Sequence, residues 1–334
     1  MSSGSSDLWV ITTYYNPLRW SSRLDNYRAF RRELQAPLLT VEWDTGGRYA
    51  LTAADADVLV QVSGGDHMWQ KERLLGMALA ALPSHVRHVA WLDCDVMFAD
   101  PDWLERTRGL LATHDVVQPF RRVAYLDQVL TRRVTGGGRL PEPPALASAE
   151  QRPSFLEVFT ALGERTAEMD LGRRFDPAPG TGRYQIMARP AYGHAWAARR
   201  DFMARIGWYD RCILGGGDLF FAYGITGQAA ALLENHRSVG WDFYGGEGYR
   251  QWAAAIARAG WPRIACGDEL LLHLFHGELA DRQYRSRIDG LVPFGLDLGR
   301  DVTARPGEPW SWTRNRAELD AYVLAYLKHR QEDG

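Results

Sequence analysis

The sequence predicts an α/β protein built on a doubly wound, mixed and mostly parallel sheet that is flanked by helices. Short, β-rich apolar runs alternate with helical patterns through the first 125 residues, which is typical of parallel strands joined by crossover helices. The length of 334 residues and the 46% of hydrophobic residues are enough for a full core. The expected strands are 8–14, 38–43, 57–62, 88–92 and 115–120.

Each of the intervening segments carries a signal of its own. The run 8–14 ends at the turn pair Asn16-Pro17, and apolar residues then recur on one stripe of a helix expected over 21–34. Pro83 ends a helix predicted over 68–82. Asp100 is the expected cap of a third helix, with Pro101 at its first position.

The segment 134–154 is rich in Gly and Pro, and we expect a flexible loop or lid there, or a plain linker. The second half is less regular, and we expect it to complete a single domain over 7–330 and not to fold alone. Further helices are expected at 154–164, 218–228, 247–259, 279–288 and 316–330.

Composition excludes several classes of protein. The formal net charge of −2 gives no electrostatic reason for a nucleic-acid or acidic-membrane partner. Cys94, Cys212 and Cys266 are odd in number and widely spaced, which argues against a disulfide framework or a structural zinc site. No run approaches the ~20 apolar residues of a membrane span, and residues 1–6 lack the regions of a signal peptide. We therefore expect a cytoplasmic protein.

The clearest chemical signal is Asp93-Cys-Asp95, directly after the buried strand 88–92. Ligands of open α/β sheets bind beyond the carboxyl ends of the strands. Two carboxylates placed there can share a divalent cation with a diphosphate, whose negative charge would otherwise be repelled. The alternative is purely structural, because Asp is common in loops that follow strands.

These residues lie in blocks that resemble the GT-A glycosyltransferases. The helix 68–75 and the strand with its DxD motif, 90–98, look like the corresponding elements of that family, and 11–17 is similar to its first strand and donor-base loop. The second half resembles the β-1,4-galactosyltransferases at 193–200, 206–210 and 215–218, and their Met-x-x-His pair falls on His273-Leu-Phe-His276. The blocks cover about 100 residues, and their order is more specific than any one of them.

The resemblance implies a metal site that holds Mn²⁺ or Mg²⁺. Asp95 would bind the metal directly, and Asp93 would contact the donor ribose or a metal-bound water. His276 would be the second protein ligand. His273 could join it only if the chain turns, since side chains three apart on an extended segment diverge. A core role is the alternative for both histidines.

The resemblance also implies the substrate contacts. Asp218 would be the general base of an inverting displacement, or alternatively a helix cap. Acceptor contacts would come from Trp196, Gly216 and Gly217, although Trp196 could instead be a core residue. Donor contacts would come from Thr13, Tyr14, Asn16, Lys71 and Arg73, together with Asp93 and Asp95. For Lys71 and Arg73 the alternative is ordinary surface charge.

Departures from the galactosyltransferase pattern predict a different acceptor. Gly217 stands where that group has a Glu that holds the acceptor, and Leu214 replaces an aromatic residue. His273 replaces Met, so the preferred metal can differ as well.

The sequence thus predicts a metal-dependent glycosyltransferase that uses a nucleotide-diphosphate sugar, with UDP as the expected nucleotide. Residues 7–125 would form the nucleotide-sugar-binding half and 155–330 the acceptor and metal-completing half. A saccharide, a natural product or a peptide is favoured as acceptor over a nucleic acid. Two alternatives stay open. A nucleotidyltransferase usually carries a Gly-rich loop after the first strand, and 12–19 contains no glycine. A catalytically silent sugar-binding protein is the other.

Overall fold

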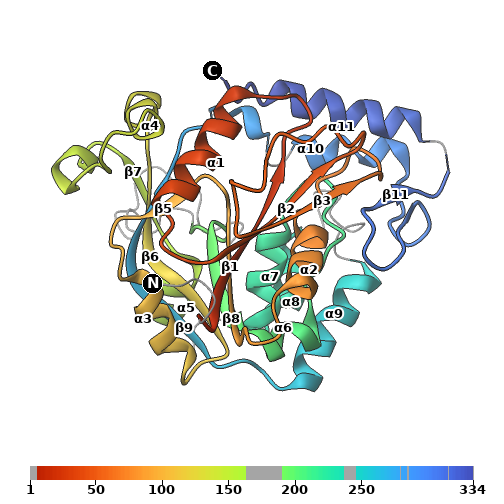
Figure 1. The fold of residues 1–334 in the computed structure, drawn as a ribbon. Coiled ribbons are helices and arrows are strands. Elements are labelled where there is room, and N and C mark those ends of the chain that lie inside the picture. The colour runs from red at the N-terminus through yellow and green to blue at the C-terminus, as the bar shows by residue number, and fades with distance from the viewer. Residues whose placement is uncertain are drawn as a thin grey trace, which may run out of the picture.

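The computed structural model describes residues 6–162, 190–236, 246–278, 280–283, 286–314 and 316–333. A mixed sheet with helices on both faces forms its centre (Figure 1), which confirms the predicted fold class. Most of the expected strands and helices lie within two or three residues of their predicted bounds, but the strand expected over 115–120 continues to Tyr125. The strands of the central sheet are β1 (Leu8–Tyr15), β2 (Leu38–Asp44), β3 (Val58–Ser63), β4 (His88–Leu92), β5 (Val96–Phe98), β6 (Val116–Tyr125), β7 (Glu150–Pro153), β8 (Ala195–Arg199) and β9 (Ile264–His273).

The sheet runs in the order β3-β2-β1-β4-β8-β6-β9-β5, with β7 paired to β6. Parallel ladders join β3, β2, β1 and β4, and also β6 and β9, while β8 is antiparallel to both β4 and β6. Strands β1, β4, β6 and β9 therefore point the same way. Their carboxyl ends meet at one edge, where ligands of such sheets bind.

Helices cover both faces of this sheet. They are α1 (Ser21–Glu33), α2 (Lys71–Ala81), α3 (Trp103–Leu111), α4 (Gln128–Thr135), α5 (Phe155–Leu162), α6 (Arg200–Ile206), α7 (Gly217–Ile225), α8 (Ala229–His236), α9 (Glu247–Ala259), α10 (Ser286–Asp289) and α11 (Ala317–His329). Short elements complete the fold: the 3₁₀ turns Pro143–Leu146, Ala280–Arg282 and Val292–Phe294, and the ribbon of β10 (Val302–Thr303) and β11 (Ser311–Trp312).

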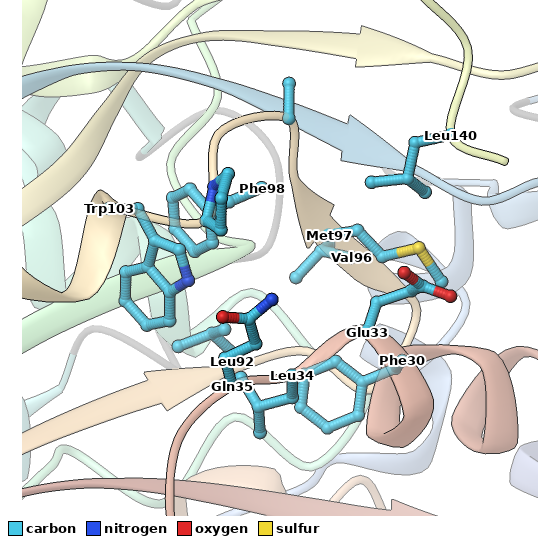
Figure 2. Close-up of a pocket in the computed structure, with 12 residues that line it drawn as sticks. Phe30, Glu33, Leu34, Gln35, Leu92, Val96, Met97, Phe98, Trp103 and Leu140 are labelled. Carbon is cyan, nitrogen blue, oxygen red and sulfur yellow. The ribbon is translucent and has the colours of Figure 1, made fainter. Parts of the chain in front are cut away.

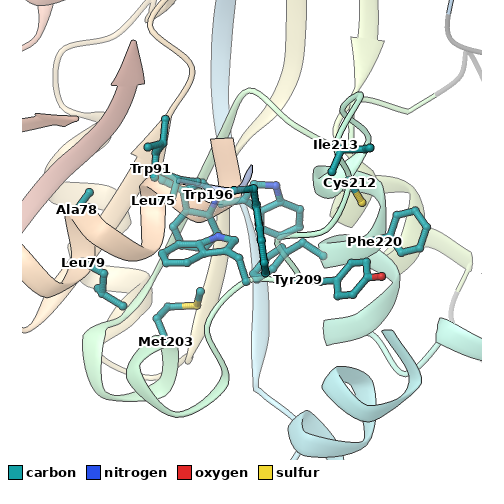
Figure 3. Packing of buried hydrophobic residues seen from close by; sticks show 14 of the residues in the cluster. Leu75, Ala78, Leu79, Trp91, Trp196, Met203, Tyr209, Cys212, Ile213 and Phe220 are labelled. Carbon is teal, nitrogen blue, oxygen red and sulfur yellow. The ribbon is translucent and has the colours of Figure 1, made fainter. Parts of the chain in front are cut away.

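Strand β1 shows how the sheet separates two cores. Trp9 and Ile11 face the core that α2, α6, α7, α9 and α11 cover, whereas Leu8 and Val10 face the core under α1 and α3. Alternate residues of a strand point to opposite faces, so a strand buried on both sides reads as a continuous apolar run. In the larger core, the Trp91 ring meets the Trp208 ring edge-on at 5.1 Å, and Trp196 packs nearby (Figure 3).

Two expectations about helix starts were wrong. Helix α3 begins at Trp103, not Pro101, because the Asp100 carboxylate accepts a hydrogen bond from the Asp102 amide and pairs with Arg106, which holds the preceding residues in a turn. Helix α7 begins at Gly217 with Gly216 as its N-cap, so Asp218 lies in the first turn and is not the cap.

Two further expectations also need correction. The segment 134–154 is not wholly irregular, since β7 within it pairs with the end of β6. The helix expected over 279–288 is divided into the turn Ala280–Arg282 and the short helix α10. The last two residues of the helix expected at 154–164 lie outside the described residues.

Among the described residues, no helix has both the length and the apolar character needed to cross a bilayer.

Candidate functional site

The Asp93-Cys-Asp95 motif forms the turn between β4 and β5 at the edge where the strand ends meet. Its backbone is fixed from both sides: the Asp93 amide donates to the His194 carbonyl at 2.8 Å, and the Leu274 amide donates to the Asp95 carbonyl at 2.9 Å. His273 ends β9 opposite Val96 of β5. The pairing of β5 with β9 therefore brings Asp95 and His273, which are 178 positions apart in the chain, to one place.

Asp95, His273 and His276 form a compact cluster whose candidate ligand atoms all lie within 4.8 Å of one another. Nε2 of His276 lies 3.0 Å from Oδ2 of Asp95, and the two Nε2 atoms are 3.3 Å apart. Strand β9 ends at His273, so the extended conformation does not continue to His276. Both histidines can therefore face one point, as the sequence predicted only for a chain that leaves the extended conformation here.

The cluster has the donors of a divalent-metal site. Oδ1 of Asp95 is buried and has no hydrogen-bond partner among the described residues, which leaves a carboxylate oxygen directed at the cluster. Burial lowers the pKa of His273 well below its usual value, so this imidazole is in the neutral form that binds metals. Burial opposes the charge on Asp95, but His276 and His273 hold the pKa of that carboxyl well below its usual range. Two imidazoles and a carboxylate fit Mn²⁺ or a similar ion.

Arg282 contacts the nitrogen of His276 that faces the other two residues of the cluster. One of its terminal nitrogens lies 2.9 Å from Nε2 of His276. Nε2 thus faces both a guanidinium, which can only donate, and the Asp95 carboxylate, which can only accept. The guanidinium thus brings positive charge to the same atoms that a metal ion would contact.

Lys71, Asp93 and Asp218 make a second charged group beside the first. Nζ of Lys71 lies 2.6 Å from Oδ1 of Asp93 and 3.0 Å from Oδ2 of Asp218, and its side chain is only 11% exposed. Lys71 is the first residue of α2, and Asp218 lies in the first turn of α7, where the helix dipole favours a carboxylate. Burial raises the pKa of Asp93, and the Lys71 ammonium offsets part of that increase.

His194 links the two groups and was not among the predicted site residues. Its Nδ1 lies 3.7 Å from Oδ2 of Asp93, its Nε2 lies 3.0 Å from the Tyr125 hydroxyl, and its ring centre is 4.9 Å from that of His273. Burial lowers the pKa of His194 to about 4. The residue has a φ of 74° just before β8, a conformation that no sequence pattern here indicates.

Two glycines let side chains approach this centre closely. A Cβ at Gly193 would lie 2.7 Å from Oδ2 of Asp218, and one at Gly217 would overlap the Glu72 carboxylate. Glu72 of α2 is buried, so its carboxyl group occupies the space beside Gly217 that a side chain at 217 would need. Gly217 itself has no side chain, and the Glu72 side chain of α2 occupies the space beside it.

The residues predicted to bind the donor divide into two sets. Lys71, Asp93 and Asp95 lie together at the site. Tyr14 is buried against Tyr27, and burial raises its pKa to about 12. Asn16 bonds the Tyr14 hydroxyl and the backbone of Trp20, which ties the loop after β1 to itself.

Thr13 is half-buried near the end of β1. The Arg73 guanidinium forms an ion pair with Asp210 at 3.3 Å. The Arg73 guanidinium donates to the carbonyls of Arg305 and Glu308 and stacks over Trp310. These contacts secure the segment before β11, so the direct donor contact predicted for Arg73 has no support in this arrangement.

On the predicted acceptor side, Gly216 and Gly217 begin α7 next to Asp218. Trp196 is 1% exposed and its Nε1 donates to the Tyr192 carbonyl, so the ring faces the core in this structure. Leu214 is buried as well. The two glycines are therefore at the site, and Trp196 is held in the core.

A pocket of about 190 Å³ lies between α1, β5 and the start of α3 (Figure 2). Its walls are mostly apolar and include Phe30, Met97 and the stacked pair Phe98 and Trp103. None of the predicted site residues lines it. The charged residues of the candidate site lie at the strand ends and do not line this pocket.

Comparisons with known proteins add little. No family model and no curated protein matches the chain. Among solved structures, a mycobacterial protein is 13% identical with a TM-score of 0.39, over 92% of this chain and 83% of its own. A Thermus thermophilus protein provisionally described as a transferase is 10% identical with a TM-score of 0.32, over 78% and 91%. A Desulfovibrio desulfuricans protein provisionally described as a nucleotide-diphospho-sugar transferase is 11% identical with a TM-score of 0.33, over 96% of each chain. Similarity this slight does not decide the activity of the chain.

Proposed function

We propose that this chain is a metal-dependent glycosyltransferase of the GT-A type, which transfers a sugar from a nucleoside-diphosphate sugar, expected to be a UDP-sugar, to an acceptor hydroxyl. The observation that supports it best is the adjacency of two groups at one sheet edge. Asp95, His273 and His276 could hold a cation. Asp93, from the same turn as Asp95, contacts Lys71, and Lys71 in turn contacts Asp218.

The metal-binding cluster suits the donor. A divalent cation held by Asp95, His276 and His273 would neutralise the diphosphate and stabilise it as a leaving group. Asp93 lies at the boundary between the two groups, where it could contact the donor ribose. Arg282 beside His276 places a guanidinium where diphosphate oxygens would lie, and guanidinium groups bind such oxygens well.

The Asp218 group suits the acceptor. In a single inverting displacement, the acceptor oxygen attacks the anomeric carbon while the bond from that carbon to the diphosphate oxygen breaks. The bonding electrons leave with the nucleoside diphosphate, and the acceptor proton passes to the Asp218 carboxylate. Lys71 fixes the orientation of that carboxylate and balances its charge before the acceptor binds.

Donor binding can be tested without knowing the acceptor. Melting temperatures are measured with a panel of nucleoside diphosphates and their sugars, with and without Mn²⁺, because a ligand of the native state raises the melting temperature according to its occupancy. Stabilisation by one nucleotide that requires Mn²⁺, and its loss in Asp95→Asn, is the expected result. Val129→Ala, at an exposed position on α4, is the folded control.

The competing functions give different outcomes. A nucleotidyltransferase would respond to a nucleoside triphosphate and release pyrophosphate. A catalytically silent protein would bind a sugar or a donor but would not release nucleoside diphosphate with any saccharide, natural-product or peptide acceptor. No metal-dependent response to any nucleotide would contradict the proposal.

A further inference from the structure

The segment 330–333, after α11, packs against the turn that carries His276. A Cβ at Gly277, whose φ is 89°, would lie 2.6 Å from the Arg330 carbonyl oxygen and 3.4 Å from Cα of Glu332. Position 277 therefore has to be glycine, both for its backbone conformation and because another segment lies so close. The residue after a candidate metal ligand is in direct contact with a segment distant from it in sequence.

Glu332 is the anchor of this segment. It is 1% exposed, its carboxylate accepts from Nη1 of Arg23 at 2.9 Å, and it accepts from Nε of Arg330 at 2.5 Å. A buried carboxylate with two guanidinium partners is held in one orientation.

Helix α1 fixes the segment from the other side. The Asp333 carboxylate accepts from the amides of Ser21 and Ser22, at 3.1 and 2.8 Å. Since Trp20 provides no side-chain cap, Asp333 serves the first turn of α1 in its place. Asn26 of α1 also donates to the carbonyl of Phe275, so the same helix contacts the turn that carries His276.

The candidate metal-binding cluster uses Nε2 of His276 and leaves the other ring nitrogen, Nδ1, without an assigned role. Nε2 of His276 faces Asp95 and His273, so a cation held by the cluster would bind this nitrogen and leave the ring proton on Nδ1. Nδ1 is buried and has no hydrogen-bond partner among the described residues, and Oε1 of Glu332 lies 3.9 Å from it. A shift of about 1 Å would convert this contact into a hydrogen bond.

We propose that Glu332 is a positioning residue of the metal site, whose carboxylate accepts the Nδ1 proton of His276 and so directs Nε2 toward the cation. Histidines that bind metals usually donate their other ring N–H to a carboxylate or a carbonyl, which fixes both the tautomer and the ring orientation. The inference rests on the proposed function, because it assumes that the Asp95–His273–His276 cluster binds a cation.

The test measures Mn²⁺ affinity by calorimetry and the visible spectrum of bound Co²⁺, neither of which depends on turnover. Glu332→Gln keeps the shape of the side chain but weakens its ability to accept the proton, and it should lower Mn²⁺ affinity by about tenfold or more. Glu105→Gln changes a carboxylate that is 70% exposed on α3, and it should bind Mn²⁺ like the wild type. Glu332→Asp keeps the charge near both arginines but shortens the reach toward His276, so its affinity should fall as well. It remains informative if Glu332→Gln does not fold.

A double-mutant cycle separates positioning from general structural support. In a His276→Ala background, Glu332→Gln should cause no further loss of Mn²⁺ affinity, because its effect passes through His276. An equal loss in both backgrounds, or wild-type Mn²⁺ affinity in a folded Glu332 variant, would overturn the inference. A wild-type chain that binds no divalent cation would instead contradict the proposed function on which it rests.

Discussion

The Lys71 ammonium lies 3.0 Å from the Asp218 carboxylate, and the same group reaches Asp93 on its other side. One buried cation therefore separates a carboxylate of the DxD turn from the carboxylate proposed as the general base. Without this cation, the two partly exposed carboxylates would repel each other.

Lys71→Met should therefore destabilise the protein. Removing one partner of a buried ion pair leaves uncompensated charge and costs about 3 kcal/mol. Urea unfolding at neutral pH measures the change in free energy of unfolding. Lys71→Arg keeps the positive charge and should lose clearly less stability, and equal losses in both variants would show that packing, not charge, is the cause.

Asp218→Asn should separate binding from transfer. The amide keeps the size of the side chain but cannot take the acceptor proton, so we expect donor affinity within about twofold of the wild type and a turnover lower by about 10²- to 10⁴-fold. Calorimetry with the nucleoside-diphosphate sugar measures donor affinity, and a nucleoside-diphosphate release assay measures turnover. Normal turnover would end the role of Asp218 as the base.

His276→Ala should reduce Mn²⁺ affinity far more than His194→Ala. Nε2 of His276 faces the Asp95 carboxylate, whereas His194 bonds Tyr125 and lies outside the candidate ligand set. Calorimetric titration of the two variants side by side makes the comparison, since each loses one buried imidazole near the same turn. Equal losses of Mn²⁺ affinity in the two variants would contradict the assignment of His276 as a ligand.

Glu72→Gln should alter how stability depends on pH. Burial and the nearby Asp218 carboxylate raise the pKa of Glu72 to about 8, partly offset by Lys71. The folded protein thus keeps a proton that the unfolded chain releases near pH 4.5. Between these values the unfolded state binds fewer protons, so the stability contributed by protonated Glu72 declines as pH rises.

A glutamine cannot titrate, so the stability of Glu72→Gln relative to the wild type should increase from pH 5 to pH 9. The gain should be at least about 1 kcal/mol, the equivalent of roughly one pKa unit. Urea unfolding of both proteins at several pH values gives the difference, in which most other titrating groups cancel. A pH-independent difference would mean that Glu72 ionises normally in the folded state.

Patterns local to the sequence predicted the sheet and part of the site. The strand before Asp93 and the spacing of His273 and His276 are continuous in the chain, and the structure brings Asp95 together with both histidines. Lys71 lies at the same edge because α2 begins there. Whether these groups bind a metal, a donor and an acceptor stays a prediction.

What the sequence did not predict depends on contacts between distant segments. His194 reaches the site because β8 inserts beside β4, and Glu72 fills the space beside Gly217 because α2 packs against the start of α7. Strand β7 forms because β6 extends far enough to offer it a partner. The helix start expected at Pro101 failed for a local reason, since the Asp100 side chain bonds the next turn of backbone instead.

The position of β8 also governs the order in which the molecule can assemble. Ala90 of β4 pairs with Ala197, so the centre of the sheet stays incomplete until a strand more than 100 residues later in the chain has folded. A fragment of residues 7–125 would expose the β4 edge and is expected to aggregate instead of binding nucleotide by itself. Pairings this distant in sequence slow folding, so the whole chain should fold late and cooperatively, with both halves of the site appearing in one step.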